Sequence, residues 1–407
     1  MSKSAIINGK ILTHGSDQPT EATLFLENDL ISDISPAEPS RDLQVIDAKG
    51  AIVAPGIVDL GVFATDKPAF RYGGITRAAL LPDQSPILDL PAMIKNAALA
   101  GKPDFWVHPL GAASMALEGQ KIAEFGLMKA SGAKGVSTGR KWIANSGMMH
   151  KILVYAASLD LPVIVHSQDA GLVGSAVATR GETATRLGLV SAPSVSEALA
   201  VGRDLLLAED TGAHIHFRQV TTARALDMIR AAKDKGLRVT CGITPAHLFL
   251  SDIAISGFRT FARLSPPLRC EEDRQACLAA IADGTIDVIS SGHDPRGPED
   301  KRRPFADAEP GNAGAETLLA LSLNLVRDGH ITISRLFELL STNPAQILGV
   351  NAGKIAHGAE ADLIFVKPDA PWQIDSEKMA ASAGNTPFDK MPVQGRVSAM
   401  LKGGKAI

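Results

Sequence analysis

Apolar residues follow different spacings in different parts of the chain, with β-type patterns at its two ends. Near the N-terminus, short apolar runs at 5–12, 23–26 and 30–34 are separated by Gly, Asn, Asp and Pro, which is the pattern of strands joined by turns. The same kind of sequence returns near the C-terminus, at 361–366 and 397–401. The two ends therefore predict a small β-unit.

Between these ends, strand-like apolar runs alternate with stretches of helical periodicity. The strand-like runs are 162–166, 213–217, 238–243 and 287–291, and the helical stretches are 194–208, 223–235, 313–327 and 334–340, the last ended by Asn343-Pro344. Repeated alternation of this kind implies parallel strands with helical crossovers, and its length suits a (β/α)8 barrel. We predict an α/β chain with a barrel over residues 54–348 and a composite β-sandwich domain built from residues 1–53 and 349–407.

The first crossover of this barrel is short. If 57–63 and 75–81 are consecutive parallel strands, the nine residues from Ala64 to Tyr72 separate Phe63 from Gly73, and they include Pro68. A parallel crossover with its helix needs at least about 10 to 12 residues. We therefore predict that the first crossover helix is missing.

Composition excludes several classes of partner. With 41 Lys and Arg against 44 Asp and Glu, the formal charge is −3 and no long basic run is present, which argues against nucleic-acid binding. No apolar run approaches the roughly 20 residues that span a bilayer, so no membrane partner is expected. The N-terminus lacks the apolar core of a signal peptide, which predicts a cytoplasmic protein.

Several segments, taken in order over nearly the whole chain, resemble the dihydroorotase branch of the metal-dependent amidohydrolase superfamily. They include Ala54 to Leu60, Leu161 to His166, Thr211 to His216, Ser265 to Arg269, Asn343 to Ala345 and Asn385 to Phe388. The resemblance implies an amidohydrolase-type (β/α)8 TIM barrel with a small β-sandwich domain. It also implies hydrolysis of a cyclic amide, for which bound zinc at the C-terminal ends of the strands activates water and polarises a carbonyl.

Most metal-ligand positions of that family are lost here. Gly61 and Phe63 stand where the family has a His-x-His pair, and neither side chain can ligate a metal. Gln219 replaces a ligand histidine, and Gly292 replaces the aspartate that serves as ligand and general base. Only His166 retains a ligand position. The resemblance therefore implies a barrel that keeps its framework without its metal site.

Other positions of the resemblance have changed in the same direction. Thr65 stands where the family has an arginine that holds a substrate carboxylate, and Arg140 stands where a ligating carboxylate is expected. Asp83 and Ser265 occupy places where the family usually has asparagine. These changes remove substrate contacts as well as ligands.

His166, His293 and Asp294 are the candidate residues of a relic pocket. His293 and Asp294 are either a displaced acid–base or ligand pair, or residues that make loop hydrogen bonds. We expect the second role, because a shifted carboxylate seldom meets the narrow distance tolerance of coordination.

Two functional hypotheses follow from the resemblance. The first is a catalytically inactive, metal-free dihydroorotase-like protein of pyrimidine biosynthesis that is a structural partner of aspartate carbamoyltransferase in an oligomer. Similar metal-free chains occur in bacteria as scaffolds bound to that enzyme. The alternative is an active zinc-dependent dihydroorotase with a rearranged site on His166, His293 and Asp294, joined by Gln219 or a modified lysine. A metal-free pocket that binds a small metabolite is a third possibility.

Overall fold

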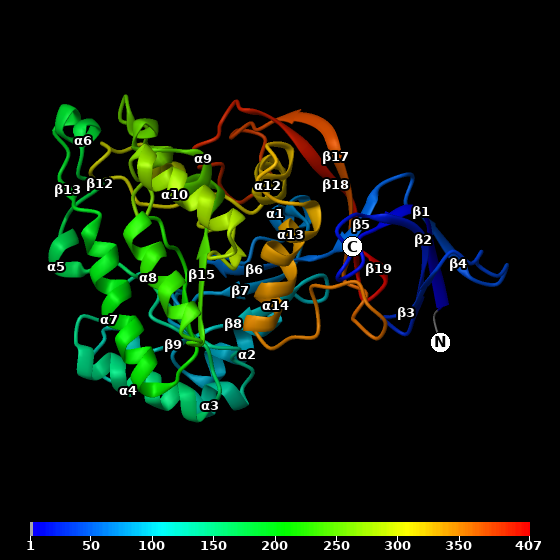
Figure 1. The fold of residues 1–407 in the computed structure, drawn as a ribbon, viewed down its shortest axis with the longest axis horizontal. Helices are drawn as coiled ribbons and strands as arrows, with labels where there is room; N and C mark the ends of the chain where they lie inside the picture. The colour runs from blue at the N-terminus through cyan, green and yellow to red at the C-terminus, as the bar shows by residue number, and fades with distance from the viewer. Residues whose placement is uncertain (1–2) are drawn as a thin grey trace.

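The computed structural model describes residues 3–407, and a barrel of parallel strands forms its centre (Figure 1). In chain order the barrel strands are β6 (Ile57–Val62), β7 (Ile75–Leu80), β8 (Trp106–Pro109) continued by β9 (Gly111–Ala112), β10 (Val136–Ser137), β11 (Val163–Val165), β14 (Ile215–Phe217), β15 (Val239–Ile243) and β16 (Val288–Ile289). Sequential strands pair in parallel throughout. The expected barrel is confirmed.

The first and last barrel strands meet through specific hydrogen bonds. The Phe63 N–H, just after β6, donates to the His293 carbonyl at 2.8 Å. The buried carboxylate of Asp59 on β6 accepts hydrogen bonds from the N–H of Ser291, at 3.1 Å, and from its hydroxyl. These contacts tie the loop after β16 to β6, so they fix residues at the C-terminal mouth of the barrel.

Helices cover the outside of the barrel, as apolar faces at helical spacing predict. They are α1 (Lys67–Gly73), α2 (Pro91–Leu99), α3 (Phe125–Ala130), α4 (Ser146–Ser158), α7 (Val195–Thr211), α8 (Ala223–Asp234), α9 (Pro245–Phe249), α10 (Glu271–Ala282), α11 (Pro298–Lys301), α12 (Leu318–Arg327), α13 (Ile333–Phe337) and α14 (Asn343–Ile347). Between β11 and α7 the chain inserts a small unit with α5 (Ala170–Val173), β12 (Ala178–Thr179), α6 (Glu182–Leu187) and β13 (Ser191–Ala192). No helix within residues 3–407 is long and apolar enough to cross a membrane.

The prediction that the first crossover helix is missing is wrong. The helix α1 connects β6 and β7 and is only shortened, to seven residues. Asp66 caps its first turn by accepting the Ala69 N–H at 3.3 Å, Pro68 fits that turn, and Gly74 ends it at a φ of 79°. Since β6 ends at Val62, before Phe63, the connection has just enough residues for two turns.

The prediction that the helix over 334–340 ends at Asn343-Pro344 is also wrong. A π-helical segment, Glu338–Thr342, follows α13 and leads directly into α14. Proline in a continuous α-helix would clash with the carbonyl four residues earlier. Here Pro344 lies in the first turn of α14, where a missing N–H costs little.

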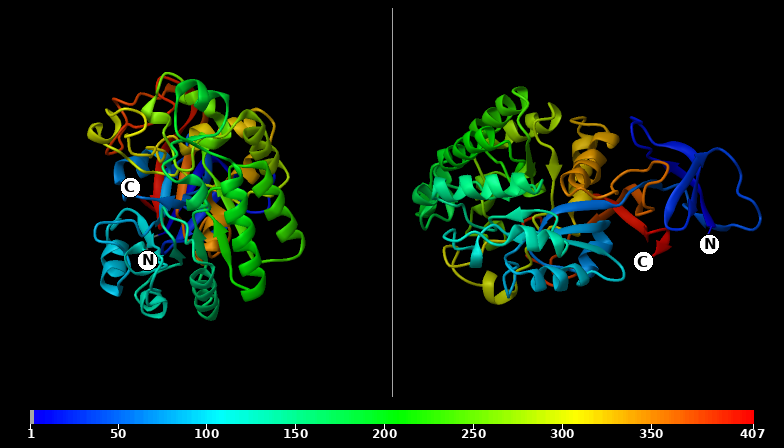
Figure 2. Two further views of the ribbon diagram at one scale, coloured as in Figure 1. Left: turned by 90° about the vertical axis from the view of Figure 1, so that its left-hand side faces the viewer. Right: turned by 90° about the horizontal axis from the view of Figure 1, so that it is seen from below.

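The two ends of the chain form the small β-domain beside the barrel (Figure 2). Its strands are β1 (Lys3–Ile11), β2 (Thr20–Glu27), β3 (Leu30–Ser35), β4 (Gln44–Asp47), β5 (Ile52–Pro55), β17 (Leu363–Gln373), β18 (Pro392–Lys402) and β19 (Lys405–Ala406). The antiparallel pairing of β5 with β17 joins N-terminal and C-terminal segments in one sheet. Apolar residues from both ends share one core, so the expected composite β-domain is confirmed.

A buried ion pair connects the barrel to this domain. Arg77 on β7 donates a hydrogen bond from Nε to the Asp362 carboxylate, and its Nη2 lies 2.7 Å from the same carboxylate. Glu360 also contacts Arg77. Asp362 accepts a further hydrogen bond from the Gly403 N–H at 2.9 Å. Both Arg77 and Asp362 are buried, so each charge needs the other to offset the cost of its removal from water.

We predict that Asp362→Ala destabilises the protein by about 3–5 kcal/mol, because it leaves the Arg77 guanidinium buried without its main counter-ion. Urea unfolding measures this change. The matched control is Glu27→Ala, which removes the exposed pair with Lys3 and should cost less than about 1 kcal/mol. Equal losses in the two variants would contradict the importance of the buried pair.

Candidate functional site

The C-terminal ends of the barrel strands surround a cavity of about 290 Å³. Its walls come from the ends of five strands, through Phe63 after β6, Arg140 after β10, Arg218 and Gln219 after β14, Thr244 after β15, and Asp294 after β16. This is the end of a (β/α)8 barrel at which active sites are found. The candidate site therefore lies where the barrel prediction places it.

One aromatic ring and two guanidinium groups meet in this mouth. The guanidinium carbon of Arg140 is 3.6 Å from the centroid of the Phe63 ring, and that of Arg218 is 4.9 Å from it. Such distances allow cation–π attraction. A Cβ atom added to Gly61 would lie 3.7 Å from Cδ of Arg218, so the arginine stem passes over the bare backbone there. Both guanidinium groups therefore lie against Phe63, and the Arg218 stem passes Gly61 at van der Waals distance.

Arg140 is neutralised by neighbouring carboxylates. Its Nη1 lies 2.5 Å from Oδ2 of Asp294, and its backbone N–H donates to Asp83 at 3.0 Å. Arg296 approaches the other oxygen of Asp294 at 3.2 Å. Both oxygens of Asp294 are therefore engaged by guanidinium groups.

Arg218 lies in a different environment from Arg140. It is buried, with 4% of its surface exposed, and it donates from Nη2 to Nδ1 of His166 at 3.3 Å. Within residues 3–407, no carboxylate lies within ion-pair distance of it. Burial lowers the pKa of Arg218 to about 10, with a smaller contribution from Arg140, while Asp83 opposes the shift. Arg218 remains a cation at neutral pH.

His166 is held as a neutral imidazole. Burial lowers its pKa to about 3, and the positive charges of Arg218 and Arg140 act in the same direction. A neutral ring can accept the hydrogen bond from Arg218 at Nδ1, which a protonated ring could not do. At the one ligand position that the resemblance retains, His166 therefore accepts a hydrogen bond from a guanidinium.

The structure does not bring His293 and Asp294 together as a pair. The His293 ring is directed toward Asp66, with Nε2 to Oδ2 at 3.4 Å, and its Nδ1 accepts the Ala315 N–H at 3.3 Å. Burial alone would raise the pKa of Asp66, but the nearby His293 ring and the hydrogen bond from the Ser382 N–H outweigh it and hold that pKa at about 2. Asp66 and Arg218 are site residues that sequence reasoning missed, although Asp66 has the signature of a helix N-cap before Lys67-Pro68.

Gln219 and Gly292 stand at two further positions where the resemblance implies metal ligands. The buried Gln219 Oε1 has no hydrogen-bond partner among the described residues. Gly292 has a φ of 58°, and a Cβ there would lie 3.0 Å from Thr244 and 3.5 Å from Gln219. A side chain at position 292 would be strained and crowded.

The residues present do not fit a zinc site. Zinc takes three or four His, Cys or carboxylate ligands, and no group of three such residues is arranged for metal binding within residues 3–407. His166, His293 and Asp294 make the separate contacts described above, so the rearranged zinc site is not assembled. The guanidinium groups of Arg140 and Arg218 would also repel a dication.

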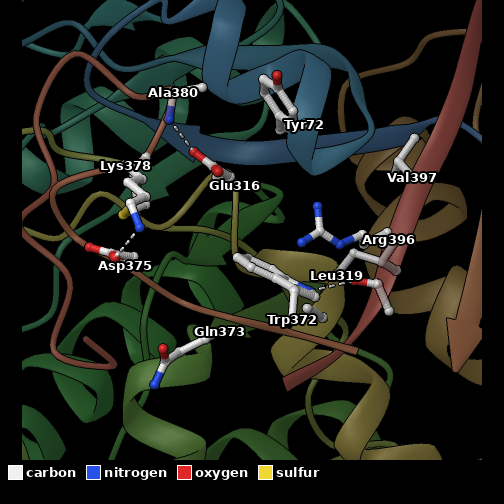
Figure 3. Close-up of a pocket in the computed structure, with 13 residues that line it drawn as sticks. Tyr72, Glu316, Leu319, Trp372, Gln373, Asp375, Lys378, Ala380, Arg396 and Val397 are labelled. Atoms are coloured by element: carbon white, nitrogen blue, oxygen red, sulfur yellow. Dashed lines mark hydrogen bonds and ion pairs between the residues drawn. The ribbon is translucent and has the colours of Figure 1, made fainter. Parts of the chain in front are cut away.

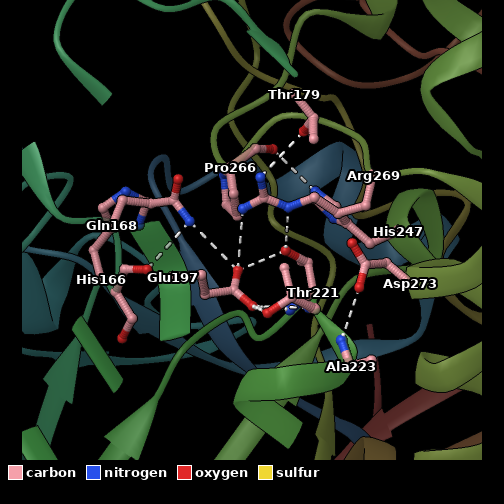
Figure 4. Close-up of polar contacts among 12 residues, drawn as sticks. His166, Gln168, Thr179, Glu197, Thr221, Ala223, His247, Pro266, Arg269 and Asp273 are labelled. Carbon is pink, nitrogen blue, oxygen red and sulfur yellow. Dashed lines mark hydrogen bonds and ion pairs between the residues drawn. The ribbon is translucent and has the colours of Figure 1, made fainter. Parts of the chain in front are cut away.

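A buried network fixes the segment that carries Arg218 and Gln219 (Figure 4). The carboxylate of Glu197, on α7, accepts hydrogen bonds from the N–H and hydroxyl of both Thr221 and Thr222 at 2.6–2.8 Å. Arg269 balances its charge at 3.3 Å. These partners occupy both carboxylate oxygens of Glu197. The network therefore has a structural role, which is to position the loop after β14.

A second cavity, of about 380 Å³, lies outside the barrel beside α12 and the β17–β18 hairpin (Figure 3). Several of its polar side chains have protein partners. Lys378 pairs with Asp375 at 3.3 Å, Glu316 accepts the Ala380 N–H at 2.8 Å, and Trp372 donates to a backbone carbonyl. The barrel mouth is therefore the stronger candidate site.

Comparison with known proteins places the chain in a family. The profile of the amidohydrolase family matches residues 109–407, so the chain belongs to that family. Within it the chain is dihydroorotase-like. It is 35% identical to a dihydroorotase of Pelobacter propionicus over 99% of this chain and 98% of that protein, and 36% identical to one of Syntrophus aciditrophicus over 100% and 99%.

Solved structures agree with the fold. An L-hydantoinase (dihydropyrimidinase) from Arthrobacter aurescens matches with a TM-score of 0.88 at 24% identity, over 100% of this chain and 96% of that one. A dihydropyrimidinase from Brevibacillus agri matches with a TM-score of 0.85 at 22% identity, over 100% and 95%. The amidohydrolase-type barrel with its β-domain is thereby confirmed.

The neutral state of His166 predicts a pH dependence of stability. An imidazole titrates near 6.5 in the unfolded chain and near 3 in the fold, so protonation favours the unfolded state as the pH falls below 6.5. His166 alone should cost about 1.4 kcal/mol of unfolding free energy between pH 7.5 and 5.5. The His166→Gln variant keeps an acceptor for Arg218 but lacks the titrating ring. Its unfolding free energy, measured with urea, should therefore fall by about 1.4 kcal/mol less than that of the wild-type protein over this pH interval.

The control for this experiment is His330→Gln, which replaces an exposed imidazole. It should retain the pH dependence of the wild-type protein. A His166→Gln variant that loses stability with acidification as steeply as wild type would contradict the buried neutral ring.

The poor fit to zinc gives a second prediction. Protein purified without chelator and desalted should hold well below one zinc per chain by elemental analysis, because too few ligands converge in the mouth. Adding zinc should not raise its melting temperature. One zinc per chain that survives desalting would contradict this assignment of the mouth.

Proposed function

We propose that this chain is a non-catalytic dihydroorotase-like protein of pyrimidine biosynthesis that acts as a structural partner of aspartate carbamoyltransferase. One observation carries the proposal. The guanidinium groups of Arg140 and Arg218 lie against Phe63, in the mouth where the resemblance places metal ligands, while the barrel around them is retained. A scaffold needs that framework and does not need the metal.

The chemistry of the mouth also favours a non-catalytic role. Cyclic amide hydrolysis needs an activated water and a group that polarises the carbonyl. His166 uses Nδ1 to accept from Arg218, and Asp294 is held between Arg140 and Arg296. Neither is placed to take a proton from water, because a general base needs an accessible lone pair within hydrogen-bond reach of it.

A zinc-dependent dihydroorotase is the second candidate. The observation in its favour is the full-length similarity to proteins named dihydroorotase. Fold and family similarity alone do not assign an activity, since activity belongs to the site. Stoichiometric zinc together with turnover of dihydroorotate would favour this candidate over the scaffold.

We assign the partner contact to the face formed by α4 and α7. Leu199 and Leu206 are seven residues apart on α7, so they lie on one side of the helix, and they are 53% and 69% exposed. Val154 is exposed on α4, which packs against α7. Exposed apolar side chains on one side of a helix are typical of surfaces that bind other proteins.

We expect the full-length chain to co-purify with aspartate carbamoyltransferase from the same organism, and to shift it to a larger species in size-exclusion chromatography with light scattering. The double variant Leu199→Glu/Leu206→Glu should weaken this association at least tenfold, because it places charge in an apolar contact. Val190→Glu, at an exposed apolar position outside these helices, is the matched control and should bind as wild type.

Loss of association in the control as well would argue against the assigned face. A transferase that never associates with the wild-type chain, and is equally stable when the chain is deleted, would overturn the scaffold proposal itself.

A further inference from the structure

We propose that the barrel mouth is a metal-independent binding site for a small anion, a carboxylate or a phosphate, with Arg218 as the central cation. The bound molecule also carries a hydrogen-bond donor, as hydroxy acids and hydrogen phosphate do. This inference goes beyond the scaffold role and does not require the transferase.

The first argument is the unbalanced charge of Arg218. A buried charge is normally paired with an opposite charge, because its desolvation is costly otherwise. Arg218 is 4% exposed, yet the groups in contact with it are a neutral imidazole and an aromatic ring, while Asp83 and Asp294 act on it only from beyond ion-pair distance. Its Nε has no hydrogen-bond partner among the described residues. An anion in the cavity would provide the missing counter-charge and accept from this group.

The second argument is that the nearby acids are already engaged. Asp294 is held by Arg140 and Arg296. Asp83 accepts the backbone N–H of Arg140 through Oδ1, and its Oδ2 has no hydrogen-bond partner among the described residues. Moving Asp294 to Arg218 would unpair two cations, and moving Asp83 would remove the acceptor of the Arg140 N–H. The mouth therefore cannot satisfy Arg218 by a simple exchange of internal partners.

The third argument is the charge of the cavity wall. Arg140, Lys141 and Arg218 line it, with Asp294 as the only carboxylate among its lining residues. The remaining titratable wall residue is His247, whose pKa is lowered to about 4 by burial, so it is neutral at physiological pH. The wall therefore has a net positive charge. Such a concave cationic surface concentrates anions and accelerates their association.

The fourth argument defines the ligand more closely. Two buried acceptors of the cavity wall, Oε1 of Gln219 and Oδ1 of Asn312, have no hydrogen-bond partner among the described residues. Buried polar atoms are rarely left unsatisfied, so a donor in the ligand is expected to reach them. A small molecule with both an anionic group and an O–H or N–H matches this arrangement of one cation and two acceptors.

Isothermal titration calorimetry with malate and, separately, with inorganic phosphate tests the site. The protein is first dialysed against EDTA and then into low-salt buffer free of carboxylate and phosphate. We expect one site per chain for at least one anion, weakening as salt rises, and no binding of glycerol. Comparison of malate with phosphate distinguishes a carboxylate site from a phosphate site, and weaker binding of succinate than of malate would support the donor requirement.

Arg218→Met should weaken binding of that anion at least tenfold, because it removes the central cation. Arg230→Met, at an arginine on α8 that does not line the cavity, is the matched control and should bind as wild type. Lys141→Met removes an exposed cavity cation without touching the core, and should weaken binding about threefold even if Arg218→Met folds poorly.

Wild-type protein that binds neither anion at 10 mM, or Arg218→Met and Lys141→Met variants that bind as tightly as wild type, would overturn the proposal. Binding that requires zinc after EDTA treatment would also overturn it. Each of these results is independent of the transferase association, so the failure of one proposal is distinguishable from the failure of the other.

Discussion

Positive charge buried at the mouth of the barrel is the constraint on which the rest of the site depends. A guanidinium removed from water must find an anion, an acceptor or an aromatic face. Arg140 is balanced by Asp294, whereas Arg218 contacts the His166 ring and Phe63 and has no carboxylate within ion-pair distance among residues 3–407. Burial keeps His166 neutral, the two cations act in the same direction, and the neutral ring accepts the hydrogen bond from Arg218.

The framework around this mouth is preserved by interactions that do not involve it. The network of Glu197, Arg269, Thr221 and Thr222 is complete within the protein and fixes the segment after β14. The Arg77–Asp362 pair fixes the β-domain against the barrel in the same way. The side chains that hold the framework are therefore different from those that line the mouth.

Much of the fold was predictable because strand and helix periodicities are local and because the order of segments resembles a known family. The errors were local too. The helix α1 fits into a connection that seemed too short, and a π-helical segment carries the chain into Pro344. The positions that lack the ligands of the resembled family could be identified one by one from the sequence, but the directions of the side chains could not. Nothing in the sequence shows that His293 turns toward Asp66 while Asp294, the next residue, turns toward Arg140.

The closure of the barrel has a consequence for the order in which the protein is made. Phe63 and Asp59 belong to the first strand of the barrel, and their partners, His293 and Ser291, follow the last. On the ribosome, more than two hundred residues are synthesised between these partners, and such distant contacts form slowly because a long loop must close first. Until then the first strand has one unpaired edge, and an unpaired strand edge can pair with another chain.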